Sequence, residues 1–249
     1  MLCFSYSFVG IIWFQRWYLQ ANTLSLCSIK RAMGFISRLY EWNLKTKISK
    51  MSVPDHIVLA LSESDLFADS NYLKLNLFAC WCKEMGIKAI TIYINIIEVD
   101  TNISIKICHK LSTEIPPALK NITPNINIIK RGDKEIRKHK TEDMVLDISL
   151  GYSGKYEMTR ALKEIMFQVK EGRLSPDAIN EDVIESHLLF KSEPDIVIRA
   201  GGKRLTDFLI WQSVYSELYF TDVNWLDFSK VDFLRVLRDF QKRQRRFGK

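Results

Sequence analysis

The sequence predicts a single α/β domain in which a mainly parallel sheet of about six strands is flanked by helices. Short apolar runs rich in β-branched residues are typical of strands that are buried on both faces. These runs are residues 56–61, 88–94, 126–129, 144–150 and 196–198. Amphipathic stretches lie between the runs, and alternation of strand and helix favours a parallel sheet. With 249 residues, of which 47% are hydrophobic, the chain can bury one full core.

The chain carries a net charge of +7, from 36 Lys and Arg residues against 29 Asp and Glu residues. This charge suits diphosphates, anionic lipids or nucleic acid, and it does not choose among them. The sequence lacks the basic helix with interleaved aromatic residues that is typical of nucleic-acid binding. We therefore expect no nucleic-acid partner.

The cysteines do not form a recognisable framework. The chain has five, an odd number, at the scattered positions Cys3, Cys27, Cys80, Cys82 and Cys108. The Cys80-x-Cys82 pair has no second pair to complete a zinc site. We therefore expect a reducing compartment.

Residues 1–35 differ from the rest of the chain and are expected to form an N-terminal extension to a domain that spans residues 36–249. The first fourteen residues carry no charge, but they are short of the ~20 residues that span a bilayer. Trp13 and Trp17, on either side of Arg16, suit a helix at the membrane interface. A disordered leader, or translation that begins near Met33, explains the extension equally well.

Helical periodicity and stop signals predict the main helices. They are a basic amphipathic helix over residues 34–50, one over 71–85 that ends at Gly86, one over 156–170 that ends at Gly172, and a final basic helix over 230–246. We expect the second helix to pack on the sheet through Leu73, Leu77, Cys80 and Trp81. Between the second and third strands, Pro116-Pro117 is expected to break any helix.

The run 196–198 leads into a basic, glycine-containing turn. Arg199, Gly202, Arg204 and Thr206 follow the strand closely, with Lys203 among them. Cations, a hydroxyl group and accessible backbone amides at the carboxyl end of a parallel strand can cradle a diphosphate. A solvated surface turn is the alternative reading of the same composition. A helix with one apolar face is expected to follow, over residues 208–218, with Glu217 near its end.

This stretch resembles the signature of the cis-prenyltransferases, the undecaprenyl and dehydrodolichyl diphosphate synthase family. The matching residues are Arg199, Gly202, Arg204, Phe208, Trp211, Gln212, Tyr215 to Asp222, Trp225 and the closing Arg245-Arg246-Phe247-Gly248. The helix at 34–50 resembles one that precedes the catalytic domain in archaeal members.

The resemblance implies the cis-prenyltransferase fold, isoprenyl diphosphates as ligands and Mg²⁺ as the cofactor of the reaction. It places Arg199, Gly202, Arg204 and Thr206 in the cradle for isopentenyl diphosphate. It also implies Glu217 as an acidic residue for the metal. The tail residues Arg246 and Gly248 are expected to reach across a dimer interface into the active site of the partner.

Two loops depart from the family pattern. After the first strand, Ser62 stands where the family has the Asp that holds magnesium, and Leu66 stands where it has an Arg that binds the allylic diphosphate. Glu63 and Asp65 add negative charge where an anion would bind. In the loop after the second strand, the family has a Phe-Ser-x-Glu-Asn-Trp motif whose Ser, Asn and Trp serve catalysis and substrate placement. Only its Glu is present here, as Glu98.

These departures favour a non-catalytic subunit, similar to the Nogo-B receptor type of partner in heteromeric cis-prenyltransferases. Such a subunit would act as a scaffold and donate its tail to a catalytic homologue. The heterodimer would make polyprenyl diphosphate for glycosyl carrier lipids, and we expect it in the cytoplasm at the membrane surface. Two alternatives stay open: a self-sufficient synthase in which Glu63 or Asp65 replaces the metal ligand, and a protein that binds isoprenyl diphosphate without turnover.

Overall fold

The structure, a computed structural model, describes most of the predicted domain. The described residues are 38–48, 52–69, 72–96, 101–123, 125–130, 144–191, 193–202, 204–205, 208–209 and 211–243. The predicted extension 1–35, Glu98, Lys203, Thr206 and the tail residues Arg246 and Gly248 lie outside them.

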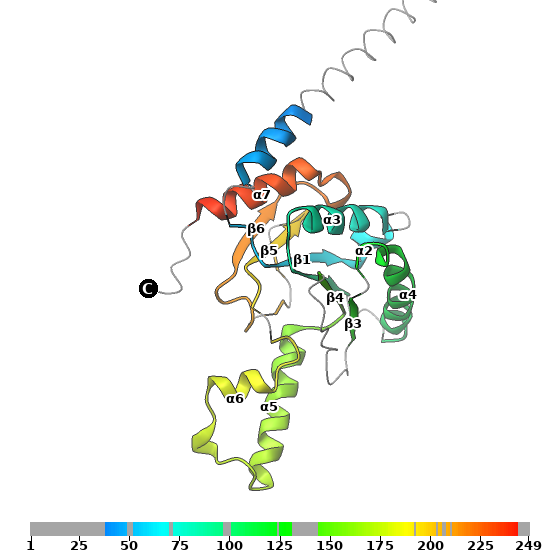
Figure 1. The fold of residues 1–249 in the computed structure, drawn as a ribbon. Helices are drawn as coiled ribbons and strands as arrows, with labels where there is room; N and C mark the ends of the chain where they lie inside the picture. The colour runs from blue at the N-terminus through cyan, green and yellow to red at the C-terminus, as the bar shows by residue number, and fades with distance from the viewer. Residues whose placement is uncertain are drawn as a thin grey trace, which may run out of the picture.

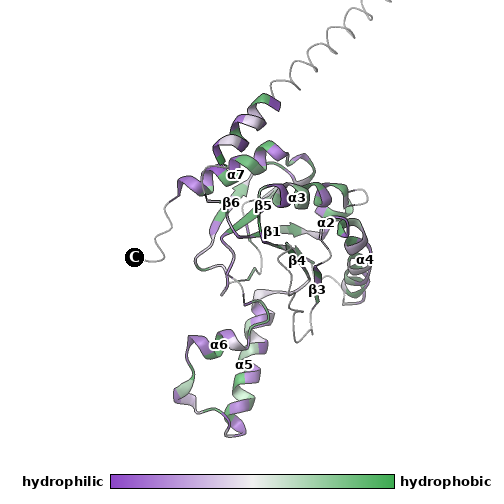
Figure 2. Ribbon diagram, viewed as in Figure 1, coloured by the Kyte–Doolittle hydropathy of each residue, from purple (hydrophilic) through white to green (hydrophobic). Residues whose placement is uncertain are grey.

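Six parallel strands form one sheet in the order β3-β4-β2-β1-β5-β6. Their bounds are β1 His56–Ser62, β2 Ala89–Asn95, β3 Ile126–Lys130, β4 Val145–Leu150, β5 Ile196–Ala200 and β6 Glu217–Thr221. β1 lies inside the sheet and is hydrophobic along most of its length (Figure 2). The predicted fold class is confirmed, and each apolar run matches a strand to within two residues.

One face of the sheet is covered by the helix at 38–48, α3 (Leu73–Glu84) and α7 (Lys230–Lys242) (Figure 1). Aromatic side chains fill the layer between these helices and the sheet. The Phe78 ring meets Phe233 edge to face at 5.3 Å and Trp225 at 5.9 Å between ring centroids. The helix at 38–48 adds Leu44 and Ile48 to the same core. Edge-to-face pairs of buried rings add stabilisation beyond the area that they bury.

The packing face predicted for α3 is wrong in part. Leu73 and Leu77 are 64% and 40% exposed, whereas Leu75, Phe78 and Cys82 are fully buried. Apolar residues surround most of this helix, so their periodicity does not single out one face. Gly86 does end the segment as predicted, with a φ of +78° that favours glycine.

The prediction that Pro116-Pro117 breaks the helix is also wrong. α4 runs from Thr101 to Leu119 and contains both prolines. They lie near its C-terminal end, and each lacks the N–H that would donate to the carbonyl four residues earlier. Leu111, Ile115 and Leu119 share a face and are fully buried, and this burial offsets the cost of the prolines.

Three further α-helices lie in the described residues, beside two short 3-10 helices at Pro176–Ala178 and Trp225–Asp227. The three α-helices are the short α2 (Glu63–Phe67), α5 (Gly154–Lys170) and α6 (Glu181–Ser186). α5 and α6 form an arm that extends away from the sheet (Figure 1). Ser153 caps α5 by accepting a hydrogen bond from the Tyr156 amide, and Gly172 follows its end as predicted. In the described residues, no helix combines the length and apolar character needed to cross a membrane.

The helix predicted over residues 208–218 is wrong. Residues 211–215 form turns, and Glu217 begins strand β6 instead of ending a helix. Two sets of contacts fix this backbone conformation. Gln212 is fixed in the interior by hydrogen bonds, and β6 pairs in parallel with β5 from Ile196↔Glu217 to Ala200↔Thr221. Tertiary pairing has overridden an apolar pattern that fits a helix.

Candidate functional site

The carboxyl ends of the central strands gather the residues predicted to bind a diphosphate. Arg199, next to last in β5, and Arg204 in the following turn line one cavity together with Tyr93 and Asn95 from β2. Ser62 ends the neighbouring strand β1, where it pairs with Asn95. The structure therefore brings Arg199 and Arg204 together at this edge, as the sequence predicted.

Arg199 is committed to groups of its own chain. Its Nη1 donates a hydrogen bond of 3.0 Å to the carbonyl oxygen of Ala60 in β1. The same Nη1 lies 3.6 Å from Oδ2 of Asp65, and about a fifth of each side chain is exposed. The guanidinium that would hold a diphosphate thus already faces a carboxylate.

The loop after β1 is built around Asp65. Oδ2 of Asp65 accepts hydrogen bonds from the Ser62 amide at 2.9 Å and from the Ser62 hydroxyl at 2.6 Å. These bonds cap the short helix α2, which carries no basic residue in its last turn. Leu66, which stands where the resemblance implies an arginine, is 1% exposed and belongs to the hydrophobic core. It provides no charge at the cradle.

The two glycines of the cradle have different roles. Gly201 has a φ of +69°, and a Cβ there would lie 3.2 Å from Oδ1 of Asn224. Its amide donates to the carbonyl oxygens of Thr221 and Val223, so this amide is not among the accessible backbone donors that the sequence predicted for the turn. Gly202 lies beside the Arg199 guanidinium, where a Cβ would be 3.8 Å from Nε.

Glu217 lies away from the cradle. It pairs with Ile196 at the amino end of β5, whereas Arg199 pairs with Phe220 further along β6. Its Oε2 accepts a hydrogen bond of 2.7 Å from Nη1 of Arg243. The structure does not bring Glu217 together with Ser62 or Arg199, and its role as a metal ligand stays a prediction.

The described residues at this edge do not fit a magnesium site. Mg²⁺ binds through carboxylates and water, and here the carboxylate of Asp65 is held by Ser62 and Arg199. Nowhere among the described residues do three His, Cys, Asp or Glu side chains gather as metal ligands. The cavity between Arg199 and Arg204 measures ≈ 20 Å³, which is about the space of one water molecule.

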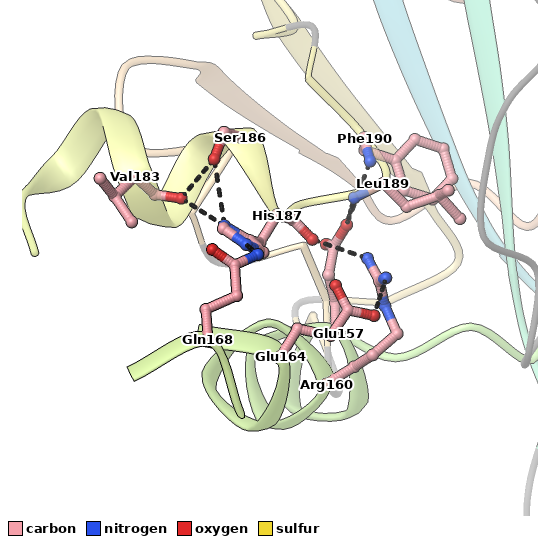
Figure 3. A network of polar contacts seen from close by, with 9 residues as sticks. All are labelled: Glu157, Arg160, Glu164, Gln168, Val183, Ser186, His187, Leu189 and Phe190. Carbon is pink, nitrogen blue, oxygen red and sulfur yellow. Dashed lines mark hydrogen bonds and ion pairs between the residues drawn. The ribbon is translucent and has the colours of Figure 1, made fainter. Parts of the chain in front are cut away.

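A buried carboxylate that the sequence reasoning missed holds the signature segment in place. Glu157, 1% exposed on α5, accepts hydrogen bonds from the amides of Leu189 and Phe190 at 2.9 and 3.1 Å (Figure 3). Its second oxygen accepts one from Nε2 of Gln212 at 2.9 Å, and the same Nε2 donates to the Phe190 carbonyl. Burial raises the pKa of Glu157, and these hydrogen bonds oppose the rise.

The same network ties α5 to α6 (Figure 3). Arg160 of α5 donates to the backbone carbonyl of His187 at 2.8 Å and pairs with Glu164 at 2.9 Å. The His187 ring is hydrogen-bonded to Gln168 of α5 and to Ser186 at the end of α6. The only sequence signal for this network is a carboxylate in the first turn of α5, next to its cap Ser153.

Comparisons with known proteins agree with this fold. The family model described as "Putative undecaprenyl diphosphate synthase" matches residues 101–248, beyond β1 and β2. The Tritrans,polycis-undecaprenyl-diphosphate synthase (geranylgeranyl-diphosphate specific) of Methanopyrus kandleri is 31% identical over 89% of this chain and 94% of its own length. The protein of the same name from Picrophilus torridus is 32% identical over 86% of this chain and 98% of its own length.

Two solved structures show the same fold at lower identity. Lavandulyl diphosphate synthase from Lavandula x intermedia, in complex with dimethylallyl diphosphate, superposes with a TM-score of 0.62 at 24% identity, over 79% of this chain and 99% of that one. A probable undecaprenyl diphosphate synthase from Campylobacter jejuni gives a TM-score of 0.60 at 22% identity, over 80% and 100%. The family match and the identity over most of both chains show that this chain belongs to the undecaprenyl diphosphate synthase family, the cis-prenyltransferases.

Proposed function

We propose that this chain is the non-catalytic, tail-donating subunit of a heterodimeric cis-prenyltransferase. The observation that carries the proposal is the loop after β1. Ser62 and Asp65 cap one another there, and Leu66 turns into the core. A loop built in this way offers no cation to an allylic diphosphate, and it adds a carboxylate beside Arg199.

The chemistry explains why this loop matters. Condensation requires an allylic diphosphate to ionise, helped by magnesium, before a second isoprenoid attacks it. The described residues do not fit the metal, so we assign both the magnesium and the allylic diphosphate to the partner subunit. This chain would supply the scaffold and the tail residues Arg246 and Gly248. The product would be a polyprenyl diphosphate for glycosyl carrier lipids, made at a membrane surface.

A second candidate is a self-sufficient synthase. It is favoured by the relatives named as geranylgeranyl-diphosphate-specific synthases, which match 84–89% of this chain at about 29–32% identity. In this candidate the loop after β1 would have to rearrange so that Asp65 or Glu63 meets the metal. The contacts of Asp65 with Ser62 and Arg199 disfavour such a rearrangement.

The two candidates differ in what must be present for turnover. The test is to co-express the tagged chain with a family homologue whose loop after the first strand is intact, and to measure incorporation of labelled isopentenyl diphosphate. A heterodimer that co-purifies and turns over, beside a chain that is inactive alone, supports the subunit. Turnover by the chain alone, unchanged by the homologue, supports the synthase.

A further inference from the structure

One oxygen atom of Asp65 collects the donors that a phosphate oxygen would use. The Ser62 amide and hydroxyl donate to Oδ2 at 2.9 and 2.6 Å, and Nη1 of Arg199 lies 3.6 Å from it. A backbone amide, a hydroxyl and a guanidinium are the groups that proteins use to bind phosphate. The carboxylate of Asp65 therefore stands where an oxygen of a bound anion would be recognised.

Nε of Arg199 also indicates a site for an anion. This atom is buried and has no hydrogen-bond partner among the described residues. The contact of Arg199 with Asp65, at 3.6 Å, is longer than a hydrogen bond. A buried donor without a partner is costly, so the guanidinium keeps binding capacity that the described residues do not use.

Charge disfavours an anionic ligand in this arrangement, because the carboxylate of Asp65 lies beside Arg199. The cavity that the described residues form beside Arg199 and Arg204 is also small, at ≈ 20 Å³. α2, which carries Asp65, has only five residues. A helix this short can shift once its link to Arg199 and Ser62 is weakened.

We propose that Asp65 is an internal counter-ion that excludes anionic ligands from the Arg199–Arg204 cradle, and that removing its charge allows this chain to bind a diphosphate group. This proposal shares one element with the proposed function, namely that Arg199 and Arg204 form a diphosphate cradle in this chain. Asp65 is a specificity-determining residue here, because it decides whether the arginines are available.

The test measures binding of inorganic diphosphate to the purified full chain by isothermal titration calorimetry. Asp65→Asn removes the charge and retains an oxygen that can cap Ser62. We expect it to bind diphosphate about 10- to 100-fold more tightly than the unsubstituted chain, the gain typical of freeing one charge-assisted contact. Adding Arg199→Gln to Asp65→Asn should remove the gain.

Asp232→Asn is the matched control. Asp232 accepts hydrogen bonds from the amide and hydroxyl of Ser229 at 3.0 and 2.6 Å, and it pairs with Arg235 at 3.1 Å. Asp232 therefore caps the start of α7 and pairs with an arginine, as Asp65 does at α2. Its substitution should leave diphosphate affinity unchanged. An equal gain in both variants would show a general charge effect and overturn the proposal.

Two further arms keep the test decisive. If Asp65→Asn does not fold, as judged by circular dichroism, Asp65→Ser removes the same charge and is held to the same expectation. Isopentenyl diphosphate is titrated beside inorganic diphosphate, and tighter binding of the isoprenoid in the variant identifies a lipid ligand. No gain for either ligand in a folded variant refutes the proposal. Because no turnover is measured, this result is independent of whether the chain acts as a subunit or as a synthase.

Discussion

Nε2 of Gln212 donates a hydrogen bond of 2.9 Å to the buried carboxylate of Glu157, 55 positions earlier in the chain. Gln212 is part of the signature stretch, and Glu157 lies in the first turn of α5. The contact joins the segment after the cradle to the arm formed by α5 and α6. It gives this family glutamine a structural role in this chain.

Replacing Glu157 by Ala should destabilise the fold. The change leaves the amides of Leu189 and Phe190 without their acceptor, while Nε2 of Gln212 keeps only the Phe190 carbonyl, and each unsatisfied buried donor costs about 1–3 kcal/mol. We expect a loss of roughly 3 kcal/mol or more in the free energy of unfolding, measured by urea denaturation. Glu164→Ala is the control, since that half-exposed partner of Arg160 should cost less than about 1 kcal/mol. Equal costs for the two variants would contradict this role.

His56 should make stability fall in mild acid. Burial lowers the pKa of His56 from 6.5 to about 4, against the opposing effect of Asp195. Between these values the unfolded chain binds a proton that the folded chain does not, so stability is full above pH 6.5 and falls as the pH drops toward 4. At pH 5 the loss should be about 2 kcal/mol relative to pH 7.

The variant His56→Gln isolates this effect. Glutamine cannot take up the proton, and its amide can still reach Thr91, whose hydroxyl lies 2.9 Å from Nε2 of His56. Urea denaturation at pH 7 and pH 5 should show a smaller difference between the two pH values in the variant. An identical difference in both proteins would mean that other groups cause the acid sensitivity.

Restoring the family's aspartate should not restore activity. Ser62→Asp introduces a carboxylate at the end of β1, but Leu66 stays in the core and Asp65 stays beside Arg199. Catalytic groups that act together do not recover singly. We expect no elongation of geranylgeranyl diphosphate by this variant alone, measured with labelled isopentenyl diphosphate. An efficient synthase made by this one change would show that the loop is less altered than we infer.

Two arginines of this chain should differ in their effect on the heterodimer. Arg246→Ala is expected to leave the complex assembled and to lower turnover by roughly 10²–10³-fold, because a guanidinium on a diphosphate is worth about 2–4 kcal/mol in the transition state. Arg199→Ala should change turnover much less, since Arg199 faces Asp65 of its own chain. Gel filtration checks assembly. The reverse order of effects would make this chain the catalytic subunit.

The sheet could be predicted from the sequence because strands buried on both faces have little choice of residue. Runs such as Ile196-Val197-Ile198 are fully buried in the structure. The ends of α3 and α5 could also be predicted. The backbone there takes a positive φ, which favours glycine, and Gly86 and Gly172 are visible in the sequence. The position of Arg199 and Arg204 at this edge of the sheet could be predicted because ligands bind at the carboxyl ends of parallel strands.

The misses have a common physical origin, since each depends on contacts between distant segments. The apolar pattern over residues 208–218 fits a helix, but pairing of β6 with β5 and the contact of Gln212 with Glu157 fix another path. Pro116 and Pro117 are tolerated because Ile115 and Leu119 are buried beside them. The contact of Asp65 with Arg199 joins α2 to β5 and leaves no local signal.

The central claim is that this chain does not catalyse chain elongation without a partner. The most direct measurement is incorporation of labelled isopentenyl diphosphate by the purified full chain alone, with Mg²⁺ and geranylgeranyl diphosphate. A reaction that contains a family homologue with an intact first loop serves as the positive control. Incorporation at background in the first reaction, and above the homologue's own rate when the two are combined, is the result that we expect. Robust magnesium-dependent elongation by this chain alone would contradict the account.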